Sequence, residues 1–168
     1  MTMVISGDSG VTFPNSSIQA SAGVVLQVVQ ANVIGSANVN YFTTTSSSYV
    51  NTGLAASITP KFSTSKILII VSPTVFYVGA TTDAGLGLGI ARASTTIAST
   101  SKIAQYSGVA NGGSQPCFSY LDSPATTSST TYNFQLCAYQ NNGGSTAYLN
   151  RNYQATDFST ITLLEIAG

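Results

Sequence analysis

The sequence predicts an all-β protein, a single antiparallel sandwich or jelly roll preceded by an extended N-terminal arm. Three observations favour it. Apolar and polar residues alternate with a period of two, as in Tyr132 to Ala138, which is typical of strands with one buried face. Short segments of this kind recur between turns rich in Gly, Pro, Asn and Ser. No segment has a convincing helical pattern, so we expect about nine or ten strands around one core.

Length and composition support one folded domain. The chain has 168 residues, of which 43% are apolar and only 6% are charged. Disordered chains combine low hydrophobicity with high net charge, so this composition predicts folding. We divide the chain into an N-terminal anchoring arm, residues 1–22, and a jelly-roll β domain, residues 23–168.

The arm is interrupted by Gly7, Gly10 and Pro14 and carries few bulky side chains. Terminal segments of this kind are normally disordered unless something holds them. We therefore expect the bulky residues of the arm to be its anchor points. These residues are Val4, Ile5, Val11, Phe13 and Ile18.

Two long apolar segments are expected to be strands. Val24 to Ile34 could be drawn as a helix, but its density of β-branched residues favours a strand. Lys66 to Ser72 is the most continuous apolar run, which suits a central strand covered on both faces. Arg92 to Ile103 is expected to hold two short strands around Ser94 to Thr96, and Tyr41 to Val50 is a Thr/Ser run with aromatic ends. Further strands are expected at Leu54 to Thr59, Phe76 to Val78, Thr146 to Asn150 and Ser159 to Ile166.

Tyr120 to Gln140 is predicted to form a long hairpin whose polar loop starts at Asp122, because Asp, Ser and Pro favour turns. If the hairpin turns near its midpoint, Cys117 and Cys137 could lie close together across it. The plainer interpretation is that both cysteines are small buried hydrophobes. Asn111 to Gly113 is a further strong turn signal.

Glycines occupy every second position at Gly85, Gly87 and Gly89. The spacing is not that of a phosphate loop, and no helical pattern follows. Alternate glycines strip side chains from one strand face, so another backbone or a large aromatic ring can approach closely. The plainer interpretation is a contact within the chain, and the alternative is close packing near a subunit axis.

The charge balance excludes several partners. Five basic residues offset five acidic ones, and neither set clusters in the sequence, which argues against nucleic acid and anionic lipid. We expect no membrane insertion and no export by a signal peptide, because long apolar runs are lacking. A neutral surface protects poorly against self-association, so partner chains are expected to cover much of it.

The sequence predicts no enzyme, no cofactor and no metal site. It contains no histidine, which excludes Ser-His-Asp and Cys-His nucleophile systems and His-containing metal sites. A Ser-Lys pairing would have to use Lys66 or Lys102. Glycoside hydrolysis would require two carboxylates to meet, for example Asp122 and Asp157, but each is better explained by its own turn.

Nine tyrosines without a tryptophan suggest carbohydrate binding, because amphipathic rings can stack on sugars. Tyr139, Tyr148 and Tyr153 lie near predicted turns and are the candidates for glycan contact. Aromatic residues of a β protein more often fill the core or a subunit interface, which is the alternative for these three.

Five segments, in this order, resemble bacteriophage virion proteins of the tail-fibre or decoration type. The resemblance covers most of the chain and implies a compact β domain similar to a tumour-necrosis-factor-like jelly roll, commonly trimeric. It brings no catalytic motif. The five segments are Ser6 to Ala22, Val24 to Gln30, Tyr49 to Ser72, Tyr120 to Leu136 and Ser159 to Gly168.

The resemblance implies a component of the virion that is assembled in the host cytoplasm and forms homotrimers. In the first reading it is a capsid decoration or cement protein that holds the major capsid protein through its arm and stabilises the head shell. In the second it is a short tail fibre or receptor-binding tip that contacts tail proteins and adheres to host surface glycan. Long fibres carry a shaft ahead of such a domain. This chain has almost nothing before the arm, which favours the decoration or cement protein.

Overall fold

The structure is a computed structural model, and it describes residues 4–6, 10–12, 24–35, 40–79, 84–100, 110–140, 144–151 and 157–168. These residues form strands and their connections, with no helix among them, which confirms the predicted all-β class. Consequently this part of the chain also has no helix capable of spanning a membrane.

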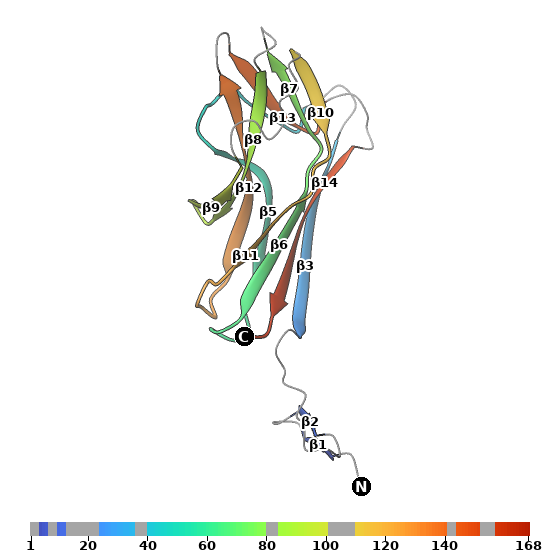
Figure 1. Cartoon of the computed structure of the whole chain (residues 1–168), viewed down its shortest axis with the longest axis vertical. Helices are drawn as coiled ribbons and strands as arrows, with labels where there is room; N and C mark the ends of the chain where they lie inside the picture. Colours follow the sequence, from blue (N-terminus) through green and yellow to red (C-terminus); the bar gives the residue numbers. More distant parts are fainter. Residues whose placement is uncertain are drawn as a thin grey trace.

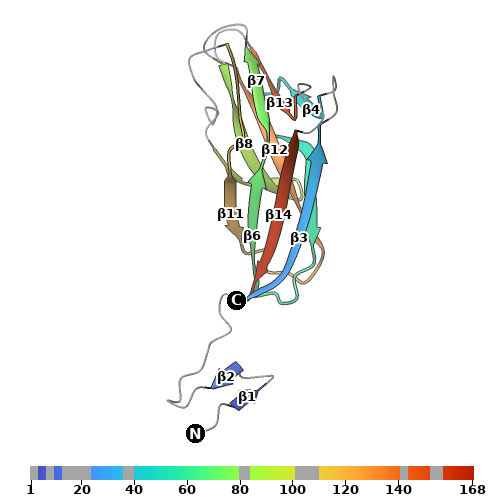
Figure 2. The same ribbon diagram turned by 90° about the vertical axis from the view of Figure 1, so that its right-hand side faces the viewer.

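One layer of the protein consists of two four-stranded antiparallel sheets that lie end to end (Figures 1 and 2). The strands of the first sheet are, in spatial order, β11 (Phe118–Asp122), β6 (Lys66–Ser72), β14 (Phe158–Ile166) and β3 (Val25–Ile34). Those of the second are β10 (Asn111–Ser114), β7 (Val75–Gly79), β13 (Ser145–Leu149) and β4 (Phe42–Thr44).

The other layer is one four-stranded antiparallel sheet. Its strands are, in spatial order, β5 (Val50–Ile58), β12 (Thr130–Gln140), β8 (Ala84–Arg92) and β9 (Thr95–Ser99). Two short strands, β1 (Val4–Ser6) and β2 (Gly10–Thr12), form a separate two-stranded ribbon that pairs with no other described strand. The boundary between arm and domain near residue 22 stays a prediction.

The connectivity of the strands is that of a jelly roll. Along the chain, β3 is followed by β4, β6 by β7, β10 by β11 and β13 by β14, so the first layer consists of four long strands interrupted at one level. When each interrupted pair counts as one strand, the sandwich has eight strands. Their spatial orders are 1-8-3-6 and 2-7-4-5, the nested antiparallel pairing of a double-sheet jelly roll. The predicted fold is confirmed.

The core lies between the two layers and follows the period of two that the sequence shows. Ile67, Ile69 and Val71 of β6 point inward, and Ile161 and Leu163 of β14 do the same. The facing sheet contributes mainly large side chains, all of them fully or almost fully buried. They are Leu54, Ile58, Leu86, Leu88, Ile90, Tyr132, Phe134 and Leu136.

The predicted hairpin at Tyr120 to Gln140 is wrong. Strand β11 pairs with β6 in one layer, and β12 pairs with β5 and β8 in the other. The polar segment 123–129 therefore connects the two layers instead of reversing the chain within one sheet. Cys117 and Cys137 are free thiols that belong to opposite layers, and Cys117 is exposed while Cys137 is buried.

The predicted turn at Asn111 to Gly113 is also wrong, because these residues begin strand β10. The glycines serve close approach instead. A Cβ atom at Gly113 would lie 2.4 Å from Cδ2 of Phe76, and one at Gly112 would lie 2.7 Å from Cε1 of Tyr77. Both rings belong to the neighbouring strand β7, so β10 can pair there only without side chains at these positions.

The alternate glycines of β8 are buried within the chain. The ring of Tyr49 covers Gly89, where an added Cβ atom would lie 3.0 Å from Cδ1 of Tyr49 and 3.2 Å from Cβ of Gln135. The Tyr49 hydroxyl reaches beyond β8 and donates a 2.5 Å hydrogen bond to the Thr100 carbonyl oxygen. A large aromatic ring approaches the stripped face, which is the intramolecular contact that the sequence favoured.

Candidate assembly surface

The outward face of the sheet β11-β6-β14-β3 carries an apolar band that crosses all four strands. Leu121 pairs with Leu68, Leu68 pairs with Leu164, and Leu164 pairs with Val28, so the four side chains form one row. Both ends of the row are open, since Leu121 is 49% and Val28 is 58% exposed. Figure 2 shows these four strands side by side.

The rows beside the apolar band are mixed. On one side Ile70 of β6 pairs with the polar residues Ser119 and Thr162, and on the other Ile166 of β14 and Val25 of β3 follow. Lys66 is the one charged side chain among the outward positions of these four strands, because Glu165 points inward and is buried. The prediction that Lys66 to Ser72 is covered on both faces is correct for the inner face, while no described segment covers Leu68 and Ile70 on the outer face.

The size of this face matches a protein interface. Four strands about 4.8 Å apart and a longest strand of 10 residues at about 3.3 Å each give a planar area of roughly 600 Å². A standard interface buries about 800 Å² per partner, which is of the same order. This area counts the polar positions of the face as well, and the apolar band is the part of it that marks an interaction site.

A buried polar network holds the sheet together where its four strands are interrupted. Asn150 is fully buried, with a positive φ of 46° that asparagine tolerates better than most residues. Its side-chain amide donates to the carbonyl oxygens of Val33 at 3.0 Å and Asp157 at 3.3 Å, and its oxygen accepts from the Ser159 hydroxyl at 2.6 Å. The Asn150 backbone NH donates to the Thr74 carbonyl at 2.9 Å. This one residue therefore connects four chain segments.

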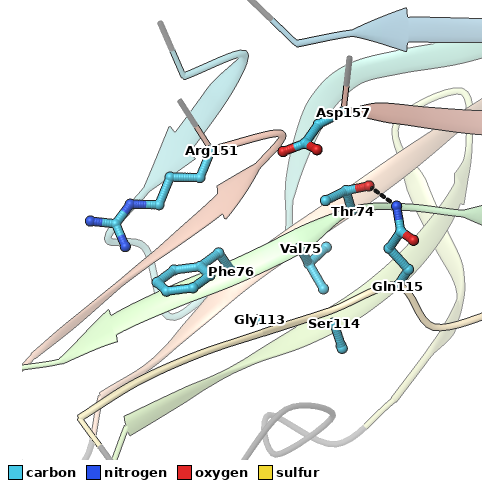
Figure 3. Close-up of a pocket in the computed structure, with 8 residues that line it drawn as sticks. All are labelled: Thr74, Val75, Phe76, Gly113, Ser114, Gln115, Arg151 and Asp157. Atoms are coloured by element: carbon cyan, nitrogen blue, oxygen red, sulfur yellow. Dashed lines mark hydrogen bonds between the residues drawn. The ribbon is translucent and has the colours of Figure 1, made fainter. Parts of the chain in front are cut away.

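A cleft of about 330 Å³ opens at the same interruption (Figure 3). Its walls come from the β6–β7 junction, the end of β10, and the residues before and after segment 152–156. They include Thr74, Phe76, Gly113, Gln115, Arg151 and Asp157. The cleft therefore combines a guanidinium, a carboxylate, an amide and an aromatic ring within one small volume.

The geometry of the cleft is held by neighbouring contacts. The Arg151 guanidinium lies over two rings, 4.5 Å from the centre of Phe76 and 5.0 Å from that of Tyr148. On the opposite wall Gln115 Nε2 donates a 2.6 Å hydrogen bond to the Thr74 hydroxyl. In Figure 3 the Asp157 carboxylate lies between Arg151 and the Thr74–Gln115 pair. No group in the described part of the chain bonds that carboxylate.

Asp122 ends β11 just before the connection 123–129, and its side chain also joins the two layers. Its carboxylate is paired with Arg92 of β8 at 3.0 Å and accepts a 2.7 Å hydrogen bond from the Tyr132 hydroxyl of β12. Asp122 pairs with Ile67, and Ile67 pairs with Glu165, so Asp122 and Glu165 lie at the same level of the sheet. This level is eight residues along the strand direction from Asp157. That distance is about 26 Å, too far for the two carboxylates to face each other across one glycosidic bond.

Glu165 is buried at the other end of β14, at the base of the sandwich. Its carboxylate accepts hydrogen bonds from Gln27 Nε2 at 2.5 Å and from the Lys61 backbone NH at 2.7 Å. Burial alone would raise the pKa of Glu165, but the hydrogen bonds from the Gln27 amide and the Lys61 backbone NH outweigh it and lower the pKa. This carboxylate is a structural anion that fastens the segment between β5 and β6.

The predicted site residues are only partly brought together. Of the anchor residues, Val4 and Ile5 lie in β1 and Val11 lies in β2, where Ile5 pairs with Val11, while Phe13 and Ile18 lie outside the described residues. Of the predicted glycan contacts, Tyr139 is in β12, Tyr148 is in β13 and Tyr153 lies outside the described residues. Tyr139 and Tyr148 belong to different sheets, and Arg151 lies over the ring of Tyr148.

No cluster of three or more His, Cys, Asp or Glu that could hold a metal ion occurs among the described residues. Lys66 points outward from β6, and Lys102 lies outside the residues that the structure describes. The burial of Tyr49, together with its neighbour Cys137, raises the pKa of the Tyr49 hydroxyl, which reflects packing over Gly89.

The fold and the open face define a jelly-roll β-sandwich with an unpartnered apolar sheet surface. No family model matches the chain, and no curated protein matches it. Among solved structures, the VP2 subviral particle of infectious bursal disease virus has a TM-score of 0.43 at 13% identity, covering 97% of this chain and 45% of that one. The Gt strain of the same virus gives 0.42 at 14% identity, covering 99% and 47%.

A third similar structure is dimeric latent PorU from Porphyromonas gingivalis, with a TM-score of 0.37 at 12% identity, covering 88% of this chain and 14% of that one. The chain thus spans less than half the length of each of these three proteins.

Sequence reasoning missed the apolar band and the cleft for different reasons. The band needs the register of four strands from distant parts of the chain, although the unbroken apolar run at Lys66 to Ser72 was a signal for it. The cleft had a weaker signal. Arg151 and Asp157 carry opposite charges and lie only six positions apart, in a chain of which only 6% of the residues are charged.

Proposed function

We propose that this chain is a non-enzymatic structural protein of a bacteriophage virion, a decoration or cement protein that forms homotrimers and stabilises the head shell. The observation that carries the proposal is the apolar band across β11, β6, β14 and β3. A face with a single charge has nothing to offer a charged partner, and a second copy of the same neutral chain complements it.

The resemblance of five ordered segments to phage virion proteins supports the virion role, and the jelly-roll order of the strands agrees with the tumour-necrosis-factor-like domain that it implies. The trimer would bind the assembled lattice of the major capsid protein and not its free subunits. Binding to one state only stabilises that state by mass action and slows disassembly. The anchor residues of the arm would supply the contact to the shell.

The assembly surface is tested by placing a charge in the apolar band. Leu68→Asp and Leu164→Asp each bury an unpaired carboxylate in the proposed interface, so the homotrimer should become a monomer in sedimentation equilibrium at micromolar protein. The matched control is Thr95→Asp, which adds the same charge at an exposed position of β9 in the opposite layer. A monomeric wild type, or trimers that survive both substitutions, would refute this surface.

The virion role is tested by counting copies. A decoration protein is present in hundreds of copies on a particle, whereas a tail component is present as a few trimers. Quantitative mass spectrometry of purified particles against the major capsid protein gives the number. A handful of trimers would leave the assembly surface intact and overturn the decoration role.

The second candidate is a short tail fibre or receptor-binding tip that adheres to host glycan. The tyrosines predicted from the sequence do not carry it, because Tyr139 and Tyr148 belong to different sheets and Arg151 covers Tyr148. The observation that favours this candidate is the cleft at the sheet interruption, whose polar groups are unlike the rest of this weakly charged surface.

A further inference from the structure

The cleft beside Asp157 is a built site and not a simple gap between strands. Arg151 is fixed by two rings, and Gln115 is fixed by its hydrogen bond to Thr74. Asp157 is held through its backbone, since its carbonyl oxygen accepts from the Gly35 NH at 2.5 Å and from Asn150 Nδ2 at 3.3 Å. Its carboxylate is left to face the cleft (Figure 3).

The groups of the cleft select the chemistry of a ligand. An anion would meet the Asp157 carboxylate, and a cation would meet the Arg151 guanidinium. A neutral molecule rich in hydroxyl groups suits both, because each hydroxyl can donate to the carboxylate and accept from the guanidinium or the Gln115 amide. The apolar part of the wall is small, because Val75 is buried and the Arg151 guanidinium lies over the Phe76 ring, so hydrogen bonds and not ring stacking would hold such a ligand.

The volume agrees with this ligand class. A cleft of about 330 Å³ lies at the lower end of the range for small-molecule sites, which is about 300 to 1,000 Å³. This volume is enough for one sugar unit, so the neighbouring units of a glycan chain would remain in solvent.

We propose that this cleft binds a single neutral sugar unit of a glycan, with Asp157 as acceptor and Arg151 and Gln115 as further polar contacts. The roles of Phe76 and Gly113 are indirect: the Phe76 ring supports the Arg151 guanidinium, and any side chain at Gly113 would displace that ring. This site differs from the predicted tyrosine site in every residue.

The test is saturation-transfer difference NMR of the full chain with the methyl glycosides of glucose, galactose, mannose and N-acetylglucosamine, each at about 10 mM, which detects the weak binding expected of one sugar unit. Dextran is a comparison probe in the same experiment, whereas inorganic phosphate and calcium chloride, which carry no C–H protons, are titrated into the protein by isothermal titration calorimetry. Signal from at least one glycoside supports the site. Where the glucoside binds, binding of dextran in addition shows that an internal glucose unit of a polymer is accepted, and its absence shows that an internal unit of dextran is rejected.

Two variants locate the signal. Asp157→Ala should lower binding about tenfold or more, because it removes a hydrogen bond to a charged group. Gln115→Trp should fill the cleft and abolish binding, and Thr127→Trp adds the same ring to the exposed connection between the layers as its matched control. Urea denaturation of each variant verifies that it is folded.

The proposal is overturned if no glycoside gives a signal, if both cleft variants bind like the wild type, or if only phosphate or calcium binds. The inference does not rest on the virion role. Sedimentation equilibrium reports on the apolar band and NMR on the cleft, so either can fail while the other holds.

Discussion

The Tyr132 hydroxyl donates a 2.7 Å hydrogen bond to the Asp122 carboxylate, and this bond crosses from one layer of the sandwich to the other. Tyr132 is fully buried, and Asp122 is also paired with Arg92 at the sandwich edge. Segment 123–129 connects the two layers, and the hydrogen bond between Asp122, just before it, and Tyr132, shortly after it, holds its two ends together.

Tyr132→Phe should lower the free energy of unfolding by about 1 to 3 kcal/mol, because it leaves a buried charged acceptor without one of its donors. Urea denaturation at pH 7 measures the change. Tyr120→Phe is the matched control, since the Tyr120 side chain is 38% exposed and no described group bonds its hydroxyl. Equal stabilities of the two variants would contradict a structural role for this bond.

The same pair predicts an alkaline limit of stability. Burial, and then the hydrogen bond to Asp122, raise the pKa of Tyr132 above its ordinary value of 10.0. The Tyr132 hydroxyl therefore makes its full contribution to the free energy of unfolding below about pH 10. This contribution is lost as the pH rises further, because Tyr132 ionises in the unfolded chain before it does so in the folded protein. The stability difference between wild type and Tyr132→Phe should narrow between pH 9 and pH 11, which chemical denaturation at several pH values checks.

Glu165 predicts the behaviour in acid. Burial alone would raise the pKa of Glu165, but hydrogen bonds, led by the one from Gln27, lower this pKa below the ordinary 4.5. The Glu165 carboxylate therefore contributes to the free energy of unfolding above about pH 4.5, and this contribution disappears as the pH falls through the pKa of the folded state. Glu165→Gln should destabilise the protein at pH 7, since an amide cannot accept from all the donors that face it. The difference from wild type should shrink at about pH 3. A constant difference across this range would contradict the assignment.

Asn150 is expected to be the most sensitive polar position of the interrupted sheet. Asn150→Gly keeps the positive φ and removes three side-chain hydrogen bonds, while Asn150→Ala also strains the backbone. We expect a loss of about 2 to 4 kcal/mol for Gly and roughly 1 kcal/mol more for Ala, measured by urea denaturation. If Ala were the more stable of the two, the backbone argument would be wrong.

Substitutions at Tyr49 and Gly89 should have non-additive effects on the free energy of unfolding. Gly89→Ala places a methyl group 3.0 Å from the Tyr49 ring, so it should destabilise the protein by about 1 to 3 kcal/mol. In the double variant with Tyr49→Ala the clash with the ring is absent. A double-mutant cycle should therefore give a favourable coupling of at least about 0.5 kcal/mol, and additive effects would show that the ring does not constrain this glycine.

The fold could be predicted from the sequence because a period of two and turn residues determine strand content directly. The pattern says which face of a strand is buried but not which strand lies beside it, which is why Tyr120 to Gln140 was misassigned. Its two strands alternate as a hairpin would, yet they face each other across the core. Gly112 and Gly113 show a second limit, because glycine permits a turn and a close ring contact equally well.

The candidate surfaces were less predictable, since both depend on long-range register. Leu68 and Leu164 are separated by 96 positions and meet only because β6 pairs with β14. Arg151 and Gln115 enter one cleft because four strands stop at the same level. Neither relationship leaves a local pattern, whereas the individual strands do.

The common interruption of the four long strands also divides the dynamics of the molecule. Backbone ladders transmit cooperativity along a sheet, and here the ladder stops at one line across β3/β4, β6/β7, β10/β11 and β13/β14. Amide hydrogen exchange should therefore resolve two protection classes, with the short strands beyond the line opening at lower free energy than the strands that carry the apolar band. The residues that line the cleft would then open more readily than those of the apolar band.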